Sequence, residues 1–189
     1  MKKNPVFVFV FLVLLLHSAA LKASGSPKEG GTVMTFSIRT DAFSEKSAIP
    51  LEYSCEGSDL SPALFWDNHP PERTKSFALI VTDPDAPMGS FTHWVAYDIP
   101  GSAKRLAKAL PTTAELKNNT KQGMNDFGKI GYGGPCPPKG HGKHRYFFTL
   151  KALDVKTLGL SAGSNKKDVE KAIKGHVLAE AAIMGTYER

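Results

Sequence analysis

The chain has 189 residues, of which 22% are charged and 41% are hydrophobic, and its formal net charge is +6 at pH 7. About 165 residues remain beyond the N-terminal segment described next, enough for one domain with a buried core. The lysines are scattered and are not interleaved with aromatic residues along one strand, which argues against a nucleic-acid-binding groove.

Residues 1–23 have the three parts of a secretory signal peptide. Lys2 and Lys3 precede an apolar stretch at residues 6–16, and small residues follow at 18–25. The apolar stretch is shorter than the roughly 20 residues of a membrane-spanning helix, so an uncleaved anchor is the weaker alternative. We expect cleavage between residues 20 and 25, a flexible lead-in at 24–32 and a periplasmic or secreted protein. Residues 1–23 hold three lysines and no acidic residue, so the net charge falls to 6 − 3 = +3.

Strands are predicted where aromatic and β-branched residues gather or alternate with polar ones. The predicted strands are residues 32–40 (TVMTFSIRT), 75–83 (KSFALIVTD), 92–100 (THWVAYDIP) and 143–154 (KHRYFFTLKALD). Residues 102–110 (SAKRLAKAL) are predicted as a short helix. A second helix is expected after a cap at Ser164 or Asn165, with a break at Gly175 and a continuation through residues 176–184 (HVLAEAAIM).

The order of these elements favours a mainly β domain with a few helices at its margins. Strands and helices do not alternate regularly along the chain, which argues against a doubly wound α/β sheet.

The segment TDPDAP, residues 82–87, is predicted to display two carboxylates from a stiff loop. Each proline has a fixed φ and disfavours the helical region for the residue before it. Asp83 and Asp85 are therefore candidate ligand-binding residues, although Asp and Pro are also common in plain turns.

The segment GGPCPPKGHGKHRY, residues 133–146, combines a glycine- and proline-rich loop with the start of a predicted strand. Alternate residues of a strand share a face, so His144 and Tyr146 should point one way and Arg145 the other. Imidazole and phenol groups can donate hydrogen bonds to an anion. With the carboxylates nearby, the cluster suits a small anion that bears a cationic tail. His93, which opens another predicted strand, is the further candidate.

Two other chemistries are weaker alternatives. His93, His141, His144, Cys136 and the aspartates are potential metal ligands, but no known zinc spacing is matched, so no metal is expected. The segment GLSAG, residues 159–163, fits a hydrolase nucleophile pattern, but the predicted helix begins too late for that motif.

The motifs DPDAP, HWVAYDIP and GYGGPCPP followed by HRY together resemble the phosphatidylethanolamine-binding protein family, also called Raf kinase inhibitor-like, and most of all its bacterial branch. The likeness runs from about Val33 to Arg189, so residues 33–189 are expected to form one domain of this kind. The resemblance implies a large antiparallel sheet packed against a smaller sheet, with peripheral helices. It also implies a pocket for anionic groups, including phosphate and phosphoethanolamine. Carried over by position, that pocket would use Asp83, Asp85, His93, Pro138, His144 and Tyr146, with Gly134 in its wall.

Cys55 and Cys136 are the only two cysteines of the chain. Export would permit a disulfide between them, whereas similar cysteines in relatives that stay in the reducing cytosol argue against one. The sequence leaves both possibilities open.

The expected function is that of an exported binding protein for small anionic or phosphorylated groups, among them membrane phospholipid headgroups such as phosphoethanolamine. No cofactor and no catalytic step are expected, and a homodimer is a further possibility. The alternatives are a module that inhibits a protease or kinase, and a hydrolase that uses the Asp–His cluster as acid and base.

Overall fold

The structure is a computed structural model that describes residues 1, 35–66 and 70–189. The predicted signal peptide beyond Met1 and the predicted lead-in lie outside the described residues. Residues 35–66 and 70–189 belong to one compact unit. Within these ranges, no helix has the length and apolar character needed to cross a membrane.

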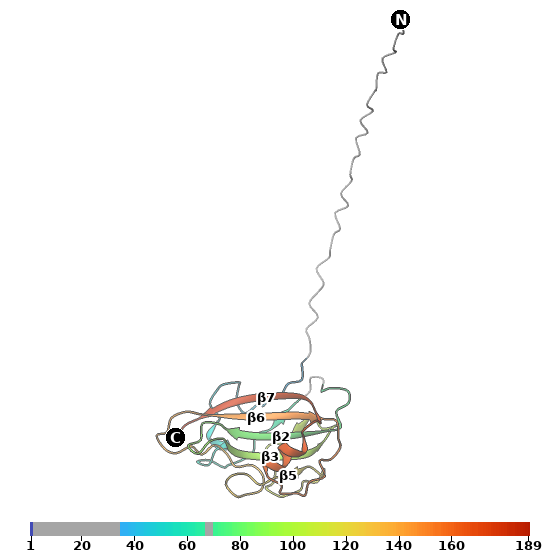
Figure 1. Cartoon of the computed structure of the whole chain (residues 1–189). Helices are drawn as coiled ribbons and strands as arrows, with labels where there is room; N and C mark the ends of the chain where they lie inside the picture. Colours follow the sequence, from blue (N-terminus) through green and yellow to red (C-terminus); the bar gives the residue numbers. More distant parts are fainter. Residues whose placement is uncertain (2–34, 67–69) are drawn as a thin grey trace. The chain divides into compact units, whose positions relative to one another are not determined.

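A five-stranded antiparallel sheet forms the centre of the domain (Figure 1). Its strands run in the order β5-β3-β2-β6-β7, with bounds Lys121–Gln122, Phe91–Pro100, Ser76–Asp83, His144–Leu153 and Val177–Tyr187. A two-stranded sheet pairs β1 (Leu64–Phe65) with β4 (Arg105–Leu106). Among the described residues, the helical elements are the 3-10 turn η1 (Leu51–Tyr53) and the helix α1 (Lys166–Ala172). The predicted fold class, a large antiparallel sheet with a smaller one, is confirmed.

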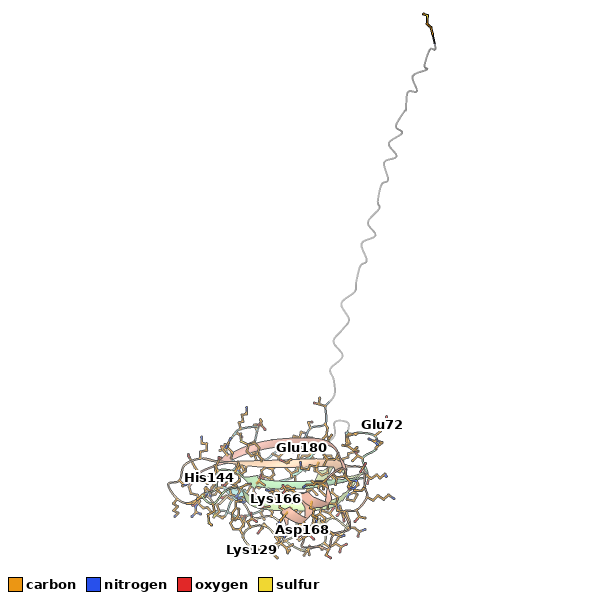
Figure 2. The ribbon with its side chains drawn as sticks, viewed as in Figure 1. Glu72, Lys129, His144, Lys166, Asp168 and Glu180 are labelled. Atoms are coloured by element: carbon orange, nitrogen blue, oxygen red, sulfur yellow. A yellow bond between two sulfur atoms is a disulfide. The ribbon has the colours of Figure 1, made fainter. Side chains whose placement is uncertain are left out.

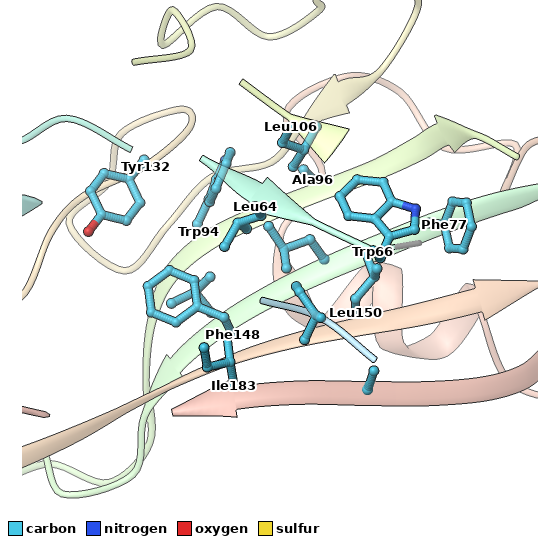
Figure 3. Close-up of a cluster of buried hydrophobic side chains, with 14 of the residues drawn as sticks. Leu64, Trp66, Phe77, Trp94, Ala96, Leu106, Tyr132, Phe148, Leu150 and Ile183 are labelled. Carbon is cyan, nitrogen blue, oxygen red and sulfur yellow. The ribbon is translucent and has the colours of Figure 1, made fainter. Parts of the chain in front are cut away.

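One face of the large sheet carries the main hydrophobic core (Figure 3). Alternate residues of each strand contribute to it, as the period of two requires. In β2 these are Phe77, Leu79 and Val81, and in β6 they are Tyr146, Phe148, Leu150 and Ala152. Leu64 of β1 and Leu106 of β4 pack on this face, so the small sheet covers the core.

The opposite face of the sheet is covered by α1. Ala78 and Ile80 of β2 form a second cluster with Val169 and Ile173 from α1 and the turn after it. The Asn165 side chain accepts a hydrogen bond from the backbone N–H of Asp168, so the predicted cap at the start of this helix is confirmed.

Residues 177–187 form strand β7, and the prediction of a helix through residues 176–184 is wrong. Ala, Leu, Glu and Met are good helix formers, but ten positions of this segment pair with β6 instead. Ala181 and Ile183 point into the core at alternate positions, and Gly185, two residues further on, is also buried. Tertiary pairing and burial therefore override the local helix preference.

Two other predicted elements also differ from the structure. The segment 102–110 is not a helix: Arg105 and Leu106 form β4, and Ala109 has a φ of 56°, which a right-handed helix cannot contain. In the described part of segment 32–40, only Arg39 makes a β-bridge, to Phe65. The strands predicted at 75–83, 92–100 and 143–154 are confirmed as β2, β3 and β6.

Candidate ligand-binding site

The predicted site residues gather at one end of the large sheet, where β2 ends and β3 and β6 begin. Antiparallel pairing places Asp83 opposite Phe91 of β3, and Thr82 opposite Phe147 of β6. Figure 2 shows His144 at this end of the sheet. Because β2 and β6 run in opposite directions, the end of β2 lies beside the start of β6, about 60 positions further along the sequence.

Asp83 and His144 form a buried pair. Nδ1 of His144 lies 2.7 Å from Oδ2 of Asp83, and the two residues are 2% and 3% exposed. An ionised carboxylate only accepts hydrogen bonds, so Nδ1 donates and the ring orientation is fixed. The other carboxylate oxygen of Asp83 accepts from the backbone N–H of Asp85 at 2.8 Å. Asp83 thus orients His144.

His93 is held by backbone carbonyls and aromatic rings. Its Nδ1 lies 2.7 Å from the carbonyl oxygen of Gly133 and 3.1 Å from that of Gly134, so Nδ1 carries the proton. Burial lowers the pKa of His93 below its ordinary value of 6.5. The neutral ring then offers Nε2 as a hydrogen-bond acceptor. Three aromatic side chains contact the ring, those of Phe91, Phe127 and Tyr146.

Tyr146 lies next to His93, with ring centroids 5.1 Å apart. The residue is 1% exposed, and its hydroxyl finds no hydrogen-bond partner among the described residues. Burial raises the pKa of the phenol well above its ordinary value, and the negative charge of Asp83 raises it further. Tyr146 therefore stays a neutral phenol.

A cavity of about 310 Å³ opens onto these groups. Its polar lining consists of Asp83, His93 and His144. The remaining lining residues are apolar or sulfur-containing: Ala86, Pro87, Met88, Phe91, Phe127, Cys136, Pro137 and Pro138. The structure thus brings Asp83, His93, Pro138 and His144 to one cavity, whereas Tyr146 lies behind His93 and does not line it.

Asp85 does not face this cavity, contrary to its expected place in the pocket. Its two carboxylate oxygens accept hydrogen bonds from Nε, an Nη and the backbone N–H of Arg145, at 2.7–2.9 Å. The hydrogen bonds from Arg145 lower the pKa of this carboxyl to about 2. Asp85 lines a second, more open cavity of about 530 Å³ together with Lys46, Lys143 and Arg145, and His144 lines both cavities. Arg145 projects from the exposed face of β6, and its charge draws Asp85 there.

Gly134 supports the cavity from behind and is not among the residues that line it. Its N–H donates to Oδ1 of Asp59 at 2.6 Å, and its carbonyl oxygen accepts from His93. A Cβ at this position would lie 2.2 Å from the carbonyl oxygen of Tyr53, so the close approach requires glycine. A disulfide joins Cys136 in the same loop to Cys55, with Cα atoms 5.4 Å apart.

The sequence alone does not assign the apolar lining residues Met88, Phe91 and Phe127 to the site, nor His141 beside it. Nδ1 of His141 lies 2.7 Å from Nε2 of His144, and the side chain is exposed. The spacing of three residues from His144 is the signal that could have identified His141. Among the described residues, no group of three or more His, Cys, Asp or Glu side chains is placed to hold a metal ion.

Comparison with known proteins assigns this architecture. The family model described as phosphatidylethanolamine-binding protein matches residues 39–188. The chain belongs to the phosphatidylethanolamine-binding protein family. Its match spans the cavity, both cysteines and nearly all of the described domain.

Curated relatives of the family are found in bacteria and archaea. A UPF0098 protein of Aquifex aeolicus is 51% identical over 160 residues, which cover 85% of this chain and 91% of the relative. A UPF0098 protein of Pyrococcus horikoshii is 44% identical over 187 residues, which cover 98% of this chain and 92% of the relative.

Solved structures of the family share the fold. Escherichia coli YbcL matches with a TM-score of 0.76 and 33% identity, over 82% of this chain and 98% of that chain. A phosphatidylethanolamine-binding protein homolog from Chlamydia trachomatis matches with a TM-score of 0.73 and 38% identity, over 82% of this chain and 99% of that chain.

Proposed function

We propose that the protein binds a small anionic or phosphorylated group, such as a phospholipid headgroup, in the 310 Å³ cavity, and that it does so without turnover. The observation that carries the proposal is the pair of buried imidazoles, His93 and His144, whose Nδ1 atoms are both held by the protein. The Nε2 of each ring is then the atom that can meet a ligand, although that of His144 contacts His141 in this structure. Membership of the phosphatidylethanolamine-binding protein family also supports the binding of an anionic ligand.

The protonated form of each imidazole is the one that suits an anion. When protonated, a ring whose Nδ1 donates to the protein presents a second N–H at Nε2, and hydrogen bonds from such a cation are stronger than neutral ones. The Nε2 atom of His144 now contacts His141, which is exposed, so an anion that reached His144 would replace this contact. Because burial favours neutral His93, anion binding there should be coupled to proton uptake.

The lining of the cavity supports binding over covalent chemistry. Among the described residues that line it there is no hydroxyl group and no free thiol, because Cys136 is in the disulfide. The proposal therefore contains no catalytic step. We also propose that the protein is exported to a periplasm or to the medium.

Titration calorimetry with inorganic phosphate tests the proposal. The His144→Ala variant should bind phosphate about tenfold more weakly or worse, since one charge-assisted hydrogen bond contributes about 1.5–3 kcal/mol. His176→Ala is the matched control, because His176 also pairs with an aspartate, Asp154, but lies outside the cavity. Unchanged binding by the His144 variant, or an equal loss in the control, would refute the proposal.

A further inference from the structure

The larger cavity beside the proposed site has no role in the proposed function. It has a volume of about 530 Å³ and shares His144 with the 310 Å³ cavity. Its lining differs from the mostly apolar lining of the smaller cavity: the residues are Lys46, Asp85, His141, Lys143, His144, Arg145, Met184 and Thr186. Six of these eight side chains carry a charge or an imidazole, so we expect a charged ligand.

Positive charge dominates this lining. Lys46, Lys143 and Arg145 are cations at neutral pH, whereas Asp85 is the one carboxylate among the described lining residues. The lining therefore has a net charge of +2 when both histidines are neutral. A concave surface that carries charge of one sign attracts ligands of the opposite sign. The larger cavity is thus suited to an anion.

Asp85 offsets the charge of Arg145 and leaves the two lysines unpaired. Both carboxylate oxygens of Asp85 accept hydrogen bonds from the Arg145 side chain. The ammonium groups of Lys46 and Lys143 form no ion pair and no hydrogen bond with any residue in the described ranges. Each ammonium group has three N–H donors, so both lysines can donate to an anion in the cavity without losing a protein partner.

The backbone at Lys46 is the unusual feature of this cavity. Its φ is 64°, in the left-handed region that favours glycine. Hydrogen bonds hold the turn in this conformation: the N–H of Lys46 donates to the carbonyl oxygen of Met184 at 2.7 Å, and the N–H of Ser44 donates to Oγ of Ser47 at 2.9 Å. A glycine would adopt this φ without strain, so the backbone does not explain the lysine. A role for the ammonium group at the cavity does explain it.

His144 connects the two cavities. Its Nε2 lies 2.7 Å from Nδ1 of His141, and His141 lines the larger cavity but not the smaller one. The Nε2 atom of His144 therefore lies at the boundary between the cavities. An anion that takes the place of His141 on this atom would border the cavity that contains the two unpaired lysines.

We propose that the protein binds a ligand with two linked anionic groups, such as a diphosphate, with one group on His144 and the other between Lys46 and Lys143. This inference rests on the proposed function and deepens it, because it adds a second anion site next to the first. A single phosphate meets the imidazoles alone. A diphosphate also gains charge-assisted hydrogen bonds from the two ammonium groups.

Calorimetry with inorganic phosphate and pyrophosphate at pH 7 tests the inference. An ionic strength of about 0.15 M is suitable, because charges more than about 8 Å from the ligand are then largely screened. Pyrophosphate should bind about tenfold more tightly than phosphate, since one added charge-assisted hydrogen bond corresponds to about that factor. Equal affinity for the two anions would overturn the inference and leave the proposed function standing. If neither anion binds, both fail.

Lysine variants locate the second group of the ligand. The double variant Lys46→Gln, Lys143→Gln should reduce the preference for pyrophosphate over phosphate from about tenfold to about twofold or less. Lys139→Gln is the matched control: Lys139 is an exposed lysine of the neighbouring loop that lines neither cavity, and this variant should keep the preference. An unchanged preference in the double variant, or an equal loss in the control, would overturn the inference.

Lys46→Gly examines one ammonium group without backbone strain. Glycine adopts the observed φ readily, so the fold should tolerate this change and the melting temperature should change little. The preference for pyrophosphate should still fall several-fold. A preference equal to that of the parent would refute the role of Lys46 in the site.

His144→Ala distinguishes a ligand that joins the two cavities from an anion held by the lysines alone. This variant should weaken the binding of both phosphate and pyrophosphate about tenfold, because each anion is expected to contact Nε2 of His144. If pyrophosphate binds the His144 variant as tightly as the parent, the lysines hold it without the imidazole. That result would overturn the inference even where the lysine variants lose binding.

Discussion

His93 is a buried base whose environment favours its neutral form. The Nδ1–H group satisfies two carbonyl oxygens, and aromatic rings exclude water from much of the imidazole. Burial is the main cause of its lowered pKa. As the pH falls, protonation of His93 in the folded protein is therefore less favourable than protonation of a histidine in the unfolded chain.

This environment predicts that acid destabilises the protein through His93. Below the unfolded-state pKa of about 6.5 the unfolded chain binds the proton first, so the free energy of unfolding decreases as the pH falls towards the lowered native pKa. Above about pH 7 this histidine does not lower the free energy of unfolding. Urea unfolding at pH 7.5, 6.5 and 5.5 measures it. His93→Gln should flatten this part of the pH dependence, whereas the control His176→Gln, at a partly exposed histidine outside the cavity, should keep it. The same slope in the parent and in His93→Gln would contradict the prediction.

Asp85 shows how one strong partner redirects a side chain. The guanidinium of Arg145 offers two donors to the carboxylate and the backbone N–H of the same residue adds a third. A carboxylate prefers this arrangement to a place among the apolar walls of the neighbouring cavity. The lowered pKa of about 2 means that the pair is present above about pH 4 and is lost as the pH falls towards 2.

At the scale of elements, the loop at residues 133–138 holds one side of the site. The disulfide from Cys136 and the N–H of Gly134 attach this loop to the segment that contains η1 and Asp59. The carbonyl oxygens of the loop then position His93. A change in the attachment of the loop should therefore alter the position of the His93 imidazole.

The disulfide should stabilise the fold and the site together. It closes a loop of 81 residues, for which the chain-entropy model gives about 4 kcal/mol. Changing both Cys55 and Cys136 to serine should lower the free energy of unfolding by about 2–4 kcal/mol and weaken phosphate binding, as measured by urea unfolding and calorimetry. A reducing agent should destabilise the parent but not the double variant. Two free thiols in the denatured, non-reduced parent would show that the bond does not form.

At the scale of the whole molecule, the N-terminal pattern predicts export. A charged start, a short apolar stretch and small residues are the features that the secretion machinery recognises. The mature protein should begin between Leu21 and Ser26 and be found outside the cytoplasm, which N-terminal sequencing of the protein from its native cells can check. A soluble cytoplasmic product that starts at Met1 would contradict export, and a variant without residues 2–23 is the control that should stay inside.

The parts of this protein that depend on local periodicity could be predicted from the amino-acid sequence. The strands β2, β3 and β6, the Asn165 cap and the shared face of His144 and Tyr146 all follow from residue types and spacing within about ten positions. The resemblance of its motifs also led to the family and to four residues of the cavity.

Contacts between residues far apart in the sequence could be identified only in the folded protein. Strand β7 forms because its edge pairs with β6 and its small residues fit the core, although its composition favours a helix. Asp85 turns to Arg145, 60 residues further along the chain, because β2 and β6 are neighbours in the sheet and the guanidinium offers it two donors. Hydrogen bonds and ion pairs between residues far apart in the chain depend on the packed fold, and no local pattern in the sequence records them.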